Sequence, residues 1–143
     1  MARNYVHMRF HVVFATKHRR RTLTPTVEKR LFPYLAGIAR NHDINTLAMN
    51  GAGDHVHLLL GFSPSASLST VVKVLKCNSS RWLRSTCVRR FAWQGGFAAF
   101  SVSRSSEAHV VEYIRRQKEH HKRTSFDDEL RLLLRLHDLK EDA

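Results

Sequence analysis

A short apolar segment with two histidines, Gly53–Leu60, constrains the fold of this chain more than any other feature. Its valine and leucine side chains, bounded by glycines, favour a β-strand. Side chains alternate between the two faces of a strand, so His55 and His57 share one face, with their backbones roughly 7 Å apart. Two imidazoles at this spacing can bind one divalent ion, although such a pair can also be two ordinary, partly buried residues of a sheet. A metal site would need a third ligand from elsewhere in the chain.

The rest of the apolar pattern predicts three more strands and four helices. The strands are expected at 5–16, 44–49 and 97–102, and the first should bury one face only. The expected N-caps of the helices are Thr24, Ser67, Ser106 and Ser125. Pro33 lies inside the first helix and should kink it. The order strand, helix, strand, strand, helix, strand, followed by two helices, predicts an α+β fold with a ferredoxin-like β-α-β-β-α-β antiparallel sheet.

The expected layers separate the histidines from the first two helices. These helices should cover one face of the sheet, which leaves His55 and His57 on the other. The third helix should run to about His121, and it carries Tyr113 and Gln117 four residues apart, on one flank. This helix could therefore bring both side chains to the paired histidines. The last helix is amphipathic, and the acidic residues 127–129 in its first turn suit the helix dipole; the sequence indicates no chemistry there.

Charge favours a polyanionic partner. The chain has 143 residues, which suits a single domain over 1–143, and its 24 Lys and Arg exceed its 12 Asp and Glu for a net charge of +12. Nucleic acid is favoured over a membrane, because no apolar run approaches the ~20 residues of a membrane span. Cys77 and Cys87 are not in a metal-binding spacing, and we expect reduced thiols in a cytoplasmic protein.

Two groups of basic residues and one tryptophan are the candidate DNA contacts. The loop after the first strand and the exposed side of the second helix could follow phosphates, although a solvated surface would look the same. Trp93 in a glycine-rich loop could stack on an unpaired base or pack in the core. The candidates are Lys17, Arg19, Arg20, Lys73, Lys76, Arg81, Arg84 and Trp93.

Six motifs together resemble a known family. They are Thr16-Lys17-His18-Arg19, Asp54-His55-Val56-His57-Leu58-Leu59, Asn78-Ser79-Ser80-Arg81-Trp82, Phe91-Ala92-Trp93-Gln94-Gly95-Gly96, Phe100-Ser101-Val102-Ser103 and Tyr113-Ile114-Arg115-Arg116-Gln117. In this order they make the chain similar to the small single-tyrosine HUH transposases of bacterial and archaeal insertion sequences, over residues 5 to about 136. Histidines in an H-x-H motif followed by Y-x-x-x-Q on a helix are the most specific part of this resemblance.

The resemblance implies an enzyme that nicks and rejoins single-stranded DNA at hairpin-bearing transposon ends. It implies that the third helix is catalytic, with Tyr113 as the nucleophile that forms a 5′-phosphotyrosine intermediate. His55, His57 and Gln117 would bind the metal, with Mg²⁺ as the cellular ion; nitrogen ligands also suit Mn²⁺. The family further implies a homodimer in which active sites are shared between subunits.

Three alternatives remain open at this level. A domesticated relative that processes chromosomal repeat hairpins would keep the same site. A non-catalytic nucleic-acid-binding module on the same fold would explain the charge and Trp93, but not the spacing of Tyr113 and Gln117. A histidine-triad nucleotide hydrolase would require a further histidine at the position of Leu59.

Overall fold

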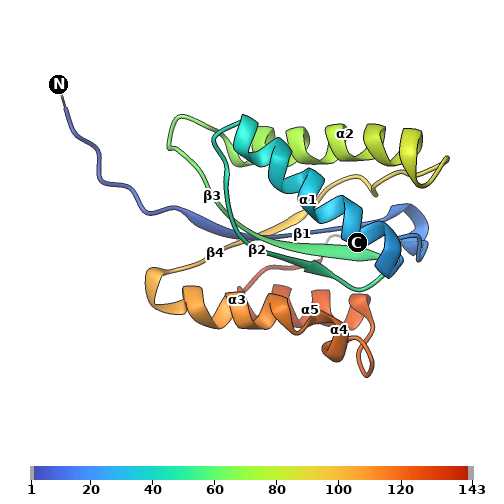
Figure 1. Ribbon diagram of the computed structural model, residues 1–143. Helices are drawn as coiled ribbons and strands as arrows, with labels where there is room; N and C mark the ends of the chain where they lie inside the picture. The colour runs from blue at the N-terminus through green and yellow to red at the C-terminus, as the bar shows by residue number, and fades with distance from the viewer. Residues whose placement is uncertain (1, 142–143) are drawn as a thin grey trace.

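The computed structural model describes residues 2–141, and its centre is a four-stranded antiparallel sheet (Figure 1). The strands are β1 (Arg9–Ala15), β2 (Asn45–Gly51), β3 (His55–Gly61) and β4 (Ala98–Ser101), in the spatial order β2-β3-β1-β4. The helices are α1 (Pro25–Asn41), α2 (Leu68–Thr86), α3 (Glu107–Arg115), α4 (Gln117–His120) and α5 (Phe126–Leu136), with single 3-10 turns η1 (Lys17–Arg19) and η2 (Arg104–Ser106). This arrangement confirms the ferredoxin-like α+β prediction.

Helices cover both faces of the sheet. Figure 1 shows α1 and α2 on one side and α3, α4 and α5 on the other. The larger core lies under α1 and α2 and includes Val12 and Phe14 of β1. The prediction that the first strand buries only one face was wrong: Val13 and Ala15, which point the other way, are buried against α5. The apolar side of α5, far away in sequence, covers that second face.

The central position of β3 makes the paired histidines fully inaccessible. β3 lies between β1 and β2, with Val13 opposite His57 and Ala15 opposite His55 in the register with β1. Both histidines are 0% exposed. The sheet therefore fixes their backbones, while the helices on their face decide what their rings contact.

Three of the four predicted helix caps form. The side chains of Thr24, Ser67 and Ser125 each accept a hydrogen bond from a backbone N–H in the first turn of α1, α2 and α5. Ser106 occupies the predicted N-cap position of α3, but its side chain makes no capping bond and a 3-10 turn precedes the helix. Helix α1 is continuous through Pro33. None of the helices within residues 2–141 has the length and apolarity needed to cross a membrane.

The helix that carries the tyrosine is shorter than predicted. It ends at Arg115, and Arg116 has the non-helical dihedral angles φ −92° and ψ 13° before α4 begins at Gln117. The Arg116 N–H still donates to the carbonyl groups of Glu112 and Tyr113, so the chain bends without losing its backbone hydrogen bonds. The bend separates Tyr113 and Gln117 onto two short helices.

Candidate functional site

Side chains from β3 and from three helices converge on the second face of the sheet. His55 and His57 project from β3, Tyr113 from α3, Gln117 from α4 and Glu129 from α5. The structure thus brings together the four residues of the predicted catalytic set and adds a buried carboxylate to them.

The Glu129 carboxylate is the centre of the cluster. It is 1% exposed, and its Oε1 lies 3.0 Å from His57 Nε2, 2.9 Å from His121 Nε2 and 3.5 Å from His55 Nε2. Its Oε2 accepts hydrogen bonds from Gln117 Nε2 at 2.8 Å and from the Tyr113 hydroxyl. One carboxylate therefore links all the candidate ligands to the candidate nucleophile.

Outer hydrogen bonds orient the two strand histidines. Asp54 Oδ1 lies 2.7 Å from His55 Nδ1, and His11 Nε2 lies 2.7 Å from His57 Nδ1. Such contacts set the rotation of an imidazole ring and direct its other nitrogen to the ligand. In both residues that other nitrogen, Nε2, points into the cluster.

Burial and the carboxylate set the protonation states. Burial lowers the pKa of His57 to about 4 and that of His11 to about 3, so both are neutral near pH 7. Burial alone would raise the pKa of Glu129, but hydrogen bonds from His121 and His57 outweigh it and hold that pKa well below the usual range. Burial and the hydrogen bond to Glu129 raise the pKa of the Tyr113 phenol.

The Glu129 carboxylate favours the protonated form of His121. Burial opposes the positive charge of that form, but the hydrogen bond to Glu129 and its negative charge raise the pKa of His121 above the ordinary value. Its other nitrogen, Nδ1, lies 2.6 Å from the Thr124 carbonyl oxygen, so both ring nitrogens face acceptors.

The donor set fits a divalent metal ion. The ligand atoms of His55, His57, His121 and Glu129 lie within 4.8 Å of one another, close to the spread that metal–ligand bonds of about 2.1 Å allow. Gln117 Oε1 lies 3.1 Å from His55 Nε2, so the amide oxygen faces the same space. Imidazole and carboxylate ligands suit borderline divalent metals such as Mn²⁺.

Five of the eight predicted DNA contacts remain at the surface of the protein. Lys17, Arg20, Lys73, Arg81 and Arg84 are exposed. Among these the guanidinium of Arg84 donates to the Phe91 carbonyl at 3.3 Å. The exposed side of α2 therefore retains three cations that can reach a phosphate.

Three of the predicted contacts have partners within the protein. Arg19 pairs with Asp127 at 3.2 Å, and Lys76 Nζ donates to two loop carbonyl groups at 2.7 Å each. Trp93 is 9% exposed and donates from its indole N–H to Ser79 Oγ at 3.0 Å. This burial favours the packing role that the sequence left open for Trp93.

Sequence reasoning missed Glu129, His121 and His11. Glu129 was interpreted as a helix-dipole residue, yet it is three residues after Phe126 and four before Leu133, both buried on the same side of α5. That spacing is the signal that could have placed it on the core face. His11 lies two residues before Val13, so the alternation of a strand places both on one face; what the sequence did not predict is that this face is buried beside His57.

The fold is that of a single-tyrosine HUH transposase. Residues 4–117 match the family "Transposase IS200 like", and the chain belongs to that family. The chain is therefore a transposase, an enzyme that cleaves and rejoins DNA. Glu129 lies outside the matched residues.

Individual relatives agree with this assignment. The chain is 28% identical over 123 residues to the ISDra2 transposase TnpA of Deinococcus radiodurans. The aligned region covers 80% of this chain and 88% of that protein. A putative transposase from Deinococcus radiodurans has a similar structure, with a TM-score of 0.66, 30% identity and coverage of 82% of this chain and 96% of that chain. A REP-associated tyrosine transposase bound to a REP hairpin shares the fold, with a TM-score of 0.63, 16% identity and coverage of 85% and 74%.

Proposed function

We propose that this transposase nicks and rejoins single-stranded DNA in the cytoplasm, with Tyr113 as the nucleophile. The observation that carries this proposal is that the Tyr113 hydroxyl and the side chains of His57 and Gln117 all contact Glu129. A nucleophile beside a cluster of metal-type ligands is the arrangement that phosphodiester cleavage requires. The direct test is incubation with single-stranded DNA from the flanks of the gene and Mg²⁺, followed by a denaturing gel on which a protein–DNA adduct would appear.

The proposed chemistry exchanges one phosphoester bond for another. The Tyr113 oxygen forms a bond to phosphorus, the bond from phosphorus to the 3′-oxygen breaks, and the products are a 5′-phosphotyrosine and a free 3′-hydroxyl. The phenol proton already lies in a hydrogen bond to Glu129 Oε2, its nearest acceptor. Because the covalent link conserves the energy of the broken bond, the reverse attack by a 3′-hydroxyl needs no ATP.

His55, His57 and Gln117 would hold the metal ion, and Glu129 and His121 extend the donor set. When bound, Mg²⁺ or Mn²⁺ supplies Lewis-acid polarisation of the scissile phosphate. His11 and Asp54 keep the two strand imidazoles oriented, and α5 excludes water from the buried side of the cluster.

Hairpin-bearing DNA is the proposed substrate. The fold is shared with a tyrosine transposase whose structure contains a REP hairpin, and the net charge of +12 suits a polyanion. A domesticated enzyme that processes chromosomal repeat hairpins would use the same residues, and the origin of the hairpin that binds most tightly distinguishes the two substrates.

Hairpin binding should depend steeply on salt. If Lys73, Arg81 and Arg84 each neutralise one phosphate, the logarithm of the affinity should fall by about 2 to 3 per tenfold increase in salt. Fluorescence anisotropy with a labelled hairpin over a range of KCl concentrations measures this slope. A flat response would mean that the basic side of α2 is only solvated.

We also propose a homodimer with shared sites. In the described chain Tyr113 lies beside its own His57, with ring centres 5.9 Å apart. The polar segment 103–106 before α3 is exposed and could let that helix cross to a partner.

A mixing experiment tests this sharing. His57→Ala keeps the tyrosine and Tyr113→Phe keeps the metal ligands, so each variant alone should be inactive. A mixed dimer with shared sites contains one intact composite site and should regain cleavage. Cleavage that stays at background after confirmed subunit exchange would show that each subunit builds its own site.

A further inference from the structure

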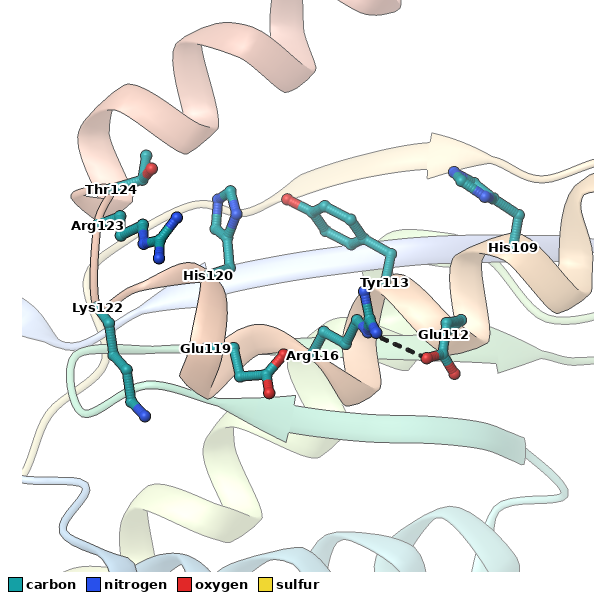
Figure 2. Close-up of a pocket in the computed structure, with 9 residues that line it drawn as sticks. All are labelled: His109, Glu112, Tyr113, Arg116, Glu119, His120, Lys122, Arg123 and Thr124. Carbon is teal, nitrogen blue, oxygen red and sulfur yellow. Dashed lines mark ion pairs between the residues drawn. The ribbon is translucent and has the colours of Figure 1, made fainter.

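A surface hollow of about 760 Å³ lies beside Tyr113, along α3, α4 and the turn that follows them. Figure 2 shows Tyr113 and His120 side by side in this hollow, with the Arg123 side chain directed toward His120. The ring centres of Tyr113 and His120 are 5.8 Å apart. The hollow is thus the place where the candidate nucleophile borders open solvent.

His120 forms the wall between the hollow and the buried cluster. Its side chain is 31% exposed, and its Nε2, which has no hydrogen-bond partner within residues 2–141, lies 3.6 Å from Glu129 Oε2. The opposite side of the cluster is closed by the packed apolar face of α5. A DNA strand that reaches the Tyr113 hydroxyl must therefore approach along the hollow.

The lining of the hollow includes the cations Arg116, Lys122 and Arg123 and the carboxylates Glu112 and Glu119. Arg116 pairs with Glu112 at 3.2 Å, as the dashed line in Figure 2 marks. Lys122 and Arg123 are exposed and form no ion pair with any residue of the described chain. Their backbone N–H groups donate to carbonyl groups of α4 at 3.2 Å, so the turn that carries them is held in place.

We propose that this hollow binds the phosphodiester backbone of the single strand next to the cleaved bond, with Lys122 and Arg123 as its phosphate contacts. This inference rests on the proposed role of Tyr113, because a strand cleaved by the Tyr113 hydroxyl carries phosphates on both sides of the cleaved bond. The contacts would be independent of base sequence, since a lysine or arginine reads only the charge of a phosphate. The hollow is separate from the basic side of α2, which lies across the sheet (Figure 1).

A binding experiment without metal tests the hollow. The variant is Lys122→Gln/Arg123→Gln, and the probe is a fluorescein-labelled oligodeoxythymidine of about 16 nucleotides in EDTA, so that no cleavage occurs. The matched control Lys29→Gln/Arg40→Gln removes two exposed cations from α1. Anisotropy titrations at several KCl concentrations give the affinity and its salt dependence.

Loss of two phosphate contacts should weaken binding about tenfold at 0.1 M salt and reduce the logarithmic salt slope by about 1.4. The control should stay within twofold of the unmodified protein. Affinity and slope that are unchanged in the Lys122→Gln/Arg123→Gln variant, or an equal loss in the control, would overturn the proposal. If the unmodified protein never forms an adduct but the variant loses affinity as expected, the hollow stands and the role of Tyr113 fails.

Discussion

Replacing Tyr113 by phenylalanine should remove the covalent protein–DNA adduct. The change deletes only the hydroxyl oxygen that attacks phosphorus, so cleavage should fall by about 10⁴-fold or more, below detection on a denaturing gel. DNA binding should remain nearly intact. Loss of the hydrogen bond to Glu129 should cost only about 1 kcal/mol of stability, because His57, His121 and Gln117 still satisfy the carboxylate.

The chain supplies its own controls for this experiment, because it has three tyrosines. Tyr5 is 88% exposed near the N-terminus, and Tyr34 stacks on Trp82 on the far side of the sheet. Tyr5→Phe and Tyr34→Phe should both keep the adduct. An undiminished adduct in Tyr113→Phe would assign the nucleophile to another residue.

Replacing His57 by alanine should abolish cleavage and weaken Mn²⁺ binding by at least about tenfold, as even the loss of an outer hydrogen bond to a metal ligand does. His57 is fully buried and contributes one of the clustered nitrogen atoms, so the substitution removes a ligand atom from the site. Isothermal titration calorimetry with MnCl₂ measures the affinity, and circular dichroism checks that the variant folds.

His7→Ala is the matched control, because this histidine is exposed in the segment before β1. It should bind Mn²⁺ as the unmodified protein does. If His57→Ala folds and binds Mn²⁺ with unchanged affinity, the strand histidines have a structural role and the metal lies elsewhere.

The fold was predictable because its signals are local. Alternation marked the strands, and Thr24 and Ser67 marked the starts of α1 and α2. The shared face of His55 and His57 followed from the period of a strand alone. The four-residue spacing of Tyr113 and Gln117 placed them together correctly even though the helix bends between them, because both still reach Glu129.

The rest of the site depends on contacts between distant segments. Neither Arg115 nor Arg116 is a helix breaker, so nothing local marks the bend before α4. Glu129 looked like a solvent-exposed acid because its burial follows from the docking of α5 onto β1, which lies 111 or more residues earlier in the chain. A carboxylate can be buried in this way only when it is paired or hydrogen-bonded. The side chains that do this for Glu129 come from three other elements.

Because Glu129 belongs to α5, near the end of the described chain, the residues of the cluster are not all made at the same time. The strands β1 and β3 are synthesised well before α5, so a nascent chain can carry both strand histidines while they still lack the Glu129 carboxylate. The cluster closes only when α5 docks. Newly made protein would therefore acquire its complete cluster of ligands and nucleophile as one of the last steps of folding.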